Sequence, residues 1–369
     1  MMTKSSSVTG TLVAIAAMVV ILAGVKLAGE VVVPFLLSLF IAIICSPTIK
    51  FMTDRKVPHW LAITLLLVFI LIIFFFLLGL INSTVREFTQ SIPQYRILLN
   101  ERISDILALA QRFHLPINIS RESVMEYFDP SVLMEFVSRV LLGFSGVVTN
   151  VFVLLLVVIF MLLEAPTIKY KLALALSQNN QDVVREERYL NRILQGVISY
   201  LGVKTVTSLM TGIAIWILLK IAGVQYAILW ATLSFLLNYI PNIGSIIAAV
   251  PIIVQALLLN GFGAGLVTAA GVLVINMVFG NILEPRMMGR TLGLSTLIVF
   301  LSLLFWGWLL GTVGMLLSVP LTMVFKIALE ADESTIKYAA LLGDVSEVHF
   351  ADSTNADIPL EKTKTRRQK

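Results

Sequence analysis

The chain has 369 residues, of which 58% are hydrophobic and only 13% are charged, and its formal net charge is +5. A soluble domain carries about 25% charged residues, so this composition excludes a soluble globular protein. The basic excess does not indicate nucleic acid, because it falls mostly in short connecting loops and at the C-terminus, where membrane orientation and anionic lipid account for it. The single cysteine, Cys45, excludes a disulfide within one chain and a cysteine-based metal site.

Three apolar runs of about 20 residues open the chain, and this is the length that a helix needs to cross a bilayer. They lie at residues 8–27, 31–49 and 60–81, within a first region 1–82. The loop after the second run is basic, with Lys50, Arg55 and Lys56. The positive-inside rule therefore places this loop, and with it the N-terminus, in the cytoplasm.

Residues 83–140 are amphipathic and nearly balanced in charge, with apolar residues such as Ile103, Ile106, Leu107 and Ala110 at helical spacing. This pattern predicts a small helical extramembrane domain, and the number of crossings before it places the domain outside the cytoplasm. Two roles stay open for it: a lid or vestibule for a solute, or a cap that packs an oligomer.

A fourth span is predicted at residues 141–165, followed by a polar, basic cytoplasmic loop at 166–196. A fifth span runs from Val197 to Leu219 and contains Lys204. An ammonium group at this depth either snorkels toward lipid headgroups or takes part in a pathway, and the sequence leaves both interpretations open.

Helix-breaking and polar residues interrupt the next apolar run at residues 238–251, which contain two prolines, a glycine and two asparagines. Lipid cannot satisfy the backbone N–H and C=O groups that such residues leave unpaired, so the segment must lie within protein or line a wet cavity. We therefore predict that it contributes four residues to a substrate pathway, namely Asn238, Pro241, Asn242 and Gly244.

This break divides residues 226–259 into two arms of roughly 22 to 24 Å, short of the ~30 Å hydrocarbon core. A second interrupted run at 294–329 has a break rich in glycine and tryptophan. Two re-entrant hairpins place Arg286 and Arg290 in the cytoplasm, as the positive-inside rule prefers, whereas one long first crossing would place them outside. We therefore predict that the core 197–330 is a pseudo-inverted repeat with one hairpin from each face, a pattern that points to a transporter binding site.

Further pathway candidates lie at the second break and in the span before it. Asn276 and Asn281 would meet the first break across a helix contact or contact a polar solute. Trp306 and Gly311 would form the tip of the second hairpin, although an interfacial tryptophan is the simpler interpretation of the first of them.

Glu284 and Arg286 flank a proline that ends the preceding helix and frees their geometry. They are candidates for a gate, for coupling to an ion, or for a helix-end clamp. Ordinary charges at a membrane interface are the alternative.

Motifs of catalysis and of ATP-driven transport are absent from the sequence. It contains no phosphate-binding loop and no His-Glu-x-x-His, and Gly143–Gly146 is one residue short of a nucleophile elbow. We therefore expect no enzyme activity, no catalytic residue, no metal site and no cofactor. The polar segment 331–369 predicts a disordered cytoplasmic tail.

Four segments carry a family resemblance: Asn238–Gly244, Asn281–Arg286 with Gly289, Leu292–Ser295 and Ser318–Leu321. Together they resemble the autoinducer-2 exporter family of bacterial inner-membrane transporters, and the likeness covers nearly the whole hydrophobic chain. Phe279–Arg286 and Leu301–Gly311 look like the branch named for exporting the quorum signal itself. The resemblance implies a multi-pass protein of the inner membrane with both termini in the cytoplasm, and a homo-oligomer, a pentamer, in which each protomer holds its own pathway.

The predicted fold is therefore an all-α polytopic membrane protein with about six full spans, two broken hairpins and a small helical extramembrane domain. The resemblance implies export of autoinducer-2, a small furanone-derived polyol, by a gradient-driven or facilitative route. Two alternatives stay open: a cation/proton antiporter, for which Glu284 is the plausible titrating carboxylate, and a non-transporting scaffold that packs through Gly307 and Gly311.

Overall fold

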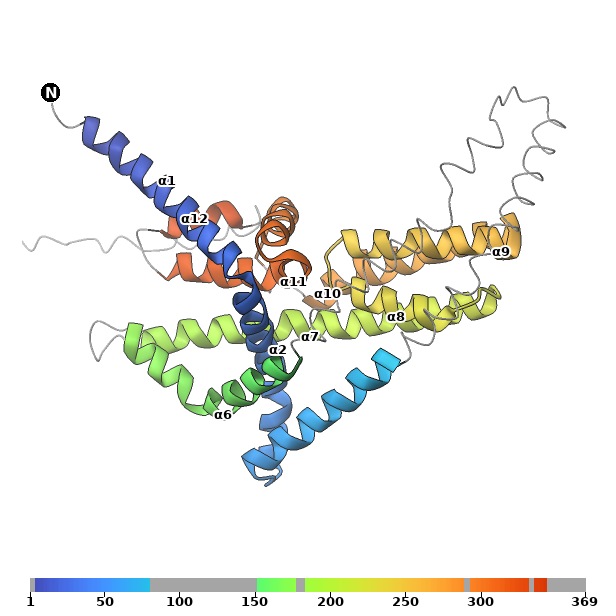
Figure 1. The fold of residues 1–369 in the computed structure, drawn as a ribbon, viewed down its shortest axis with the longest axis horizontal. Coiled ribbons are helices and arrows are strands. Elements are labelled where there is room, and N and C mark those ends of the chain that lie inside the picture. Colours follow the sequence, from blue (N-terminus) through green and yellow to red (C-terminus); the bar gives the residue numbers. More distant parts are fainter. Residues whose placement is uncertain (1–3, 80–150, 177–182, 289–292, 332–334, 344–369) are drawn as a thin grey trace, which may run out of the picture.

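The computed structural model describes residues 4–79, 151–176, 183–288, 293–331 and 335–343. These ranges consist almost wholly of helices and contain no strand (Figure 1). The predicted all-α class is therefore confirmed. The extramembrane domain predicted at 83–140 lies outside the described residues.

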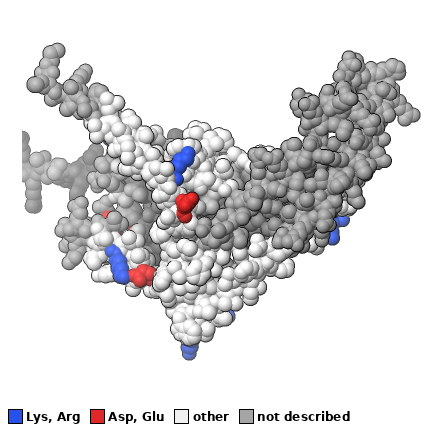
Figure 2. Space-filling view, viewed as in Figure 1, with Lys and Arg blue, Asp and Glu red and all other residues white. Residues whose placement is uncertain are grey.

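Six helices of the described ranges are long and apolar enough to cross a membrane, which confirms the polytopic membrane fold. They are Gly29–Asp54, His59–Gly79, Val151–Ile168, Glu186–Ile221, Leu259–Met288 and Thr296–Glu330. The first apolar run lies in a separate helix, α1 (Lys4–Leu27). Figure 2 shows that the described part of one face is almost uncharged, as a surface against lipid must be.

Helices extend beyond several of the predicted spans. The second and fourth runs lie in α2 (Gly29–Asp54) and α6 (Val151–Leu176), and α6 continues past Pro166 into the expected polar loop. In the predicted tail, α12 (Ile336–Leu342) forms a short helix whose Leu342 carbonyl accepts a hydrogen bond from the Ser295 N–H. This part of the tail is therefore ordered against the chain.

The long helix α7 (Val183–Ile221) is the element around which the core is built. Toward its C-terminal end, Ile215 and Leu219 belong to an apolar cluster with both arms of the first hairpin. Toward its N-terminal end, Val197 and Leu201 belong to a second cluster with the second hairpin. A third cluster joins α2, the helix His59–Gly79 and α6.

The first hairpin, named hairpin 1, consists of α8 (Ala227–Leu237), a non-helical turn, and the part of α9 (Ile243–Asn276) that precedes a bend at Gly261. The Trp230 indole N–H donates to the side-chain oxygen of Gln255, so a hydrogen bond joins the two arms. Close packing continues to the tip, where a Cβ on Gly244 would overlap the Leu237 carbonyl.

The second hairpin, named hairpin 2, is α11 (Thr296–Glu330), which breaks at Gly311 with φ 68° and ψ −149°. The Trp306 indole N–H donates to Thr322 Oγ1 at 3.0 Å. These residues would stand ~24 Å apart along a straight helix, so the bond shows that the arms fold back on each other. A Cβ on Gly314 would overlap the Trp306 carbonyl, which matches the packing at the tip of hairpin 1.

The hairpins approach α7 from its opposite ends. Hairpin 1 follows the C-terminus of α7, and its tip residue Asn238 reaches Ser208. The second arm of hairpin 2 ends near the N-terminal part of α7, where Glu330 pairs with Arg192 and Met323 lies against Gly196. Gly311 lies ~18 Å along α11 from Met323, and Ser208 lies ~18 Å along α7 from Gly196. The two tips therefore reach the same level of α7. Figure 1 shows α8 and α9 along one end of α7 and α11 along the other.

Candidate functional site

A largely buried ion pair lies at the level of α7 that both hairpin tips reach. Lys204 Nζ of α7 lies 2.6 Å from Glu284 Oε1, and the side chains are 4% and 16% exposed. Thr207 Oγ1 donates to Glu284 Oε2 at 3.5 Å. Burial of an unpaired charge costs several kcal/mol, and each group of the pair offsets this cost for the other. The Lys204 ammonium is thus enclosed by protein and does not snorkel.

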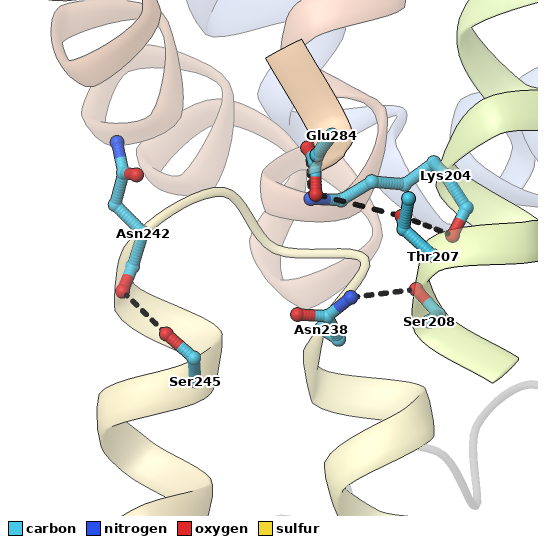
Figure 3. Close-up of polar contacts among 7 residues, drawn as sticks. All are labelled: Lys204, Thr207, Ser208, Asn238, Asn242, Ser245 and Glu284. Atoms are coloured by element: carbon cyan, nitrogen blue, oxygen red, sulfur yellow. Dashed lines mark hydrogen bonds and ion pairs between the residues drawn. The ribbon is translucent and has the colours of Figure 1, made fainter. Parts of the chain in front are cut away.

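The tip of hairpin 1 is fixed to α7 beside this pair by two side-chain hydrogen bonds. Asn238 Nδ2 donates to Ser208 Oγ at 3.0 Å, and the Tyr239 hydroxyl donates to Thr205 Oγ1 at 3.0 Å. Figure 3 shows Asn238 and Glu284 approaching the same stretch of α7 from two different elements. Three segments that are distant in sequence, namely α7, the tip of hairpin 1 and the residues around Glu284, therefore meet here.

A continuous polar stripe on α7 provides the common surface for these contacts. Its members are all buried and recur at helical spacing, so that they share one face: Tyr200, Lys204, Thr207, Ser208 and Thr211. Apolar Val197 and Ile215 continue the same face beyond both ends. Inside a membrane span, buried polar side chains are costly and mark functional sites, so this stripe is the candidate site.

A π-helix positions the carboxylate of this site. The span after hairpin 1 changes from α-helix to the π-helix η1 (Met277–Leu283), and Glu284 follows at the start of α10 (Glu284–Met288). π-helical turns inside α-helices are rare and concentrate at functional sites. Because each additional residue in a turn rotates all later side chains, η1 determines the direction in which Glu284 faces α7.

Comparison with known proteins places this arrangement in a family. The model of the AI-2E family transporters matches residues 15–333. The chain belongs to the AI-2E transporter family. The protein is therefore a multi-pass membrane transporter, and the family resemblance found in the sequence is confirmed.

Relatives of this AI-2E transporter match over almost their whole length. A Haemophilus influenzae protein, named for transport without a stated solute, is 72% identical over 91% of this chain and 97% of its own. The AI-2 transport protein TqsA of Escherichia coli K12 is 44% identical, over 89% of this chain and 94% of its own. YhhT of the same strain, also named for transport alone, is 42% identical over 90% and 93%.

The residues predicted at the first break of this transporter take different places. Asn238 is buried and contacts α7, whereas Asn242 is exposed, adopts φ 59° and points its amide away from α7 (Figure 3). The Asn242 carbonyl accepts a hydrogen bond from Ser245 Oγ at 3.2 Å, which shapes the turn. Pro241 is half-buried within this turn, and Gly244 permits the arms to approach. Of the four, only Asn238 has its side chain in the candidate site.

The other predicted residues lie around the site rather than in it. Asn276, the last residue of α9, is half-buried, and Asn281 is exposed on η1. Trp306 holds the arms of hairpin 2 together, and Gly311 is the exposed break. Glu284 pairs with Lys204 and not with the exposed Arg286, because α10 directs the carboxylate toward α7.

Four of the five stripe residues on α7 were not predicted from the sequence. The available signal was their spacing: polar residues at positions 200, 204, 207, 208 and 211 repeat with the period of one helix face inside an apolar span. No group of three or more metal-binding side chains occurs within the described ranges. The candidate site consists of hydroxyls, one amide and one ion pair.

Proposed function

We propose that this transporter exports autoinducer-2, a small furanone-derived polyol, from the cytoplasm by a gradient-driven or facilitative route. The observation that carries the proposal is the set of polar groups around the Lys204–Glu284 pair, at the level where both hairpin tips reach α7. Its hydroxyl and amide groups suit an uncharged, hydroxylated solute, since the two charges cancel. The AI-2 transport protein TqsA, at 44% identity, supports the same solute.

Hairpin 1 acts as the gate on one side of this proposed site. Two neutral hydrogen bonds, from Asn238 and Tyr239, hold its tip to α7. Each contributes about 0.5–1.5 kcal/mol net, so releasing both costs about 1–3 kcal/mol. An open state separated by a few kcal/mol is populated at about 0.1–10%, which is enough for a solute to select it.

The expected setting of the transporter follows from the family resemblance and from the charge pattern. It is the bacterial inner membrane, with both termini in the cytoplasm and a homo-oligomer, a pentamer, as the assembled form. Exposed polar side chains within or next to the spans, such as Asn281 and Arg286, support association, because lipid is a poor environment for them.

A flux assay with purified protein in liposomes tests the function. Labelled autoinducer-2 is loaded inside or outside, and the initial rate is compared between wild type, Asn238→Leu and Asn242→Gly. We expect Asn238→Leu to lower the rate by up to about tenfold, since it removes the amide proposed to bind the solute, and one such hydrogen bond contributes about 0.5–1.5 kcal/mol. Asn242→Gly keeps the positive φ and leaves the rate near wild type. Equal rates for both variants would refute the site, and no flux in wild type would refute the solute.

A cation/proton antiporter is the second candidate function, because Glu284 is a buried carboxylate next to a hairpin tip. Its counter-ion Lys204 already neutralises it, so a transported cation would have to displace the ammonium group. A sodium gradient imposed on the same liposomes tests this. An internal pH change that Glu284→Gln abolishes would establish antiport, and absence of flux for both solutes would instead support the scaffold interpretation.

A further inference from the structure

The Tyr200 hydroxyl is buried and has no hydrogen-bond partner within the described part of the chain. The Ser234 and Thr268 hydroxyls are in the same condition, but a serine or threonine hydroxyl sits next to its own helix backbone and can turn toward the carbonyl one turn back. A phenol hydroxyl stands at the end of a rigid ring and has no such option. A buried polar group without a partner calls for a water, an ion or a ligand that completes it.

Tyr200 lies beside the ion pair of the candidate site. It precedes Lys204 by one helical turn on the same face of α7. Its ring belongs to the apolar cluster that contains Met288, and Met288 follows Glu284 by one turn on α10. α7 and α10 thus face each other, with Tyr200 one turn from the lysine of the pair and Met288 one turn from its carboxylate.

The Glu284 carboxylate has hydrogen-bonding capacity left on the side that Lys204 does not occupy. Oε1 accepts from Lys204 Nζ at 2.6 Å, while Oε2 has a distant donor, Thr207 Oγ1 at 3.5 Å. A carboxylate oxygen accepts two hydrogen bonds. The Glu284 side chain is also 16% exposed, so the group can be approached from one side.

We propose that the Tyr200 hydroxyl and Glu284 Oε2 together bind one hydroxyl group of the transported solute. That hydroxyl donates to the carboxylate oxygen and accepts from the phenol, so all three groups are satisfied. This inference rests on the proposed function and adds the two groups that bind one hydroxyl of that neutral solute. Glu284 would repel a carboxylic acid, and an amine would compete with Lys204.

Unliganded stability provides the first part of the test. The full-length protein is purified as wild type, as Tyr200→Phe and as the matched control Tyr239→Phe, which removes a phenol hydroxyl that does have a partner, Thr205. We expect Tyr200→Phe to melt at or above the wild-type temperature, because it removes a group that lacks a partner. Tyr239→Phe should melt lower. An equal loss in both variants would show that the Tyr200 hydroxyl is bonded within the protein, and would overturn the proposal.

Ligand titration provides the second part. Thermal stabilisation is measured against autoinducer-2, ribose and xylitol, and we expect Tyr200→Phe to raise the half-saturating concentration about tenfold or more for each probe that stabilises the wild type. If ribose or xylitol binds and autoinducer-2 does not, the proposed solute is wrong and the Tyr200 subsite stands. If the half-saturating concentrations stay unchanged, the hydroxyl serves a bound water only. That outcome, or a wild type that no hydroxylated probe stabilises, overturns the proposal.

Discussion

Replacement of Lys204 by methionine tests whether the buried ion pair supports the fold, the transport reaction, or both. At 2.6 Å and an effective dielectric constant of ~20, the attraction between the two charges is about 6 kcal/mol. Desolvation of both groups offsets most of this attraction, so the pair itself stabilises little. Lys204→Met, however, leaves the Glu284 carboxylate buried without its partner, and we expect a loss of about 3–5 kcal/mol in the free energy of unfolding.

The double variant Lys204→Met with Glu284→Met separates stability from function. It replaces both charges with apolar side chains, so most of the stability should return, while export should stay at background because the carboxylate is gone. Equilibrium unfolding in mixed micelles and flux in liposomes measure the two effects. Lys171→Met is the matched control, since it removes the lysine of an exposed pair with Glu164 and should leave unfolding unchanged. If Lys204→Met unfolds no more easily than Lys171→Met, Lys204 does not offset the burial of the Glu284 carboxylate.

Two further predictions concern the glycines that shape the site. Gly244→Ala places a methyl group on the Leu237 carbonyl and should lower the free energy of unfolding by about 1–3 kcal/mol. The control Gly263→Ala meets no atom within 4 Å and should be neutral or slightly stabilising. Similar melting temperatures for the two variants would contradict the close packing of hairpin 1. Deletion of Gly280 removes one residue from η1 and turns Glu284 by about 100° away from Lys204. Export should then fall to background in protein that still folds, and retained export would show that η1 does not position the carboxylate.

The helical class and both hairpin breaks could be predicted from the sequence, because backbone chemistry determines them. Long apolar runs have to be helices in lipid, and a residue with a positive φ cannot continue one. Gly311 illustrates this: it lies inside the predicted second break and has φ 68°. For the first break, arm length also favoured a hairpin, since neither of its two arms is long enough to span the membrane alone.

The site itself was only partly predictable, because it depends on which helix faces meet. Asn238 and Asn242 look equivalent in sequence, yet only Asn238 faces α7, since the turn gives Asn242 a positive φ and directs its amide away. Glu284 was selected from the sequence together with Arg286, its neighbour along the chain, but the structure pairs it with Lys204. No local pattern links positions 80 residues apart. That pairing depends on the packing of α10 against α7.

The polar stripe on α7 and the two hairpin breaks are physically linked. Polar side chains on a spanning helix need partners, and neighbouring helices that are continuous and apolar would leave the buried Ser208 hydroxyl only the carbonyl one turn back on α7. A helix that ends at mid-depth brings a turn to that level, and the turn of hairpin 1 supplies the Asn238 amide and the Tyr239 hydroxyl. These partners belong to a separate hairpin, and in the proposed gate they are exchanged for those of the solute. Under that proposal, breaks placed beside the stripe let one set of contacts both stabilise the closed protein and recognise the solute.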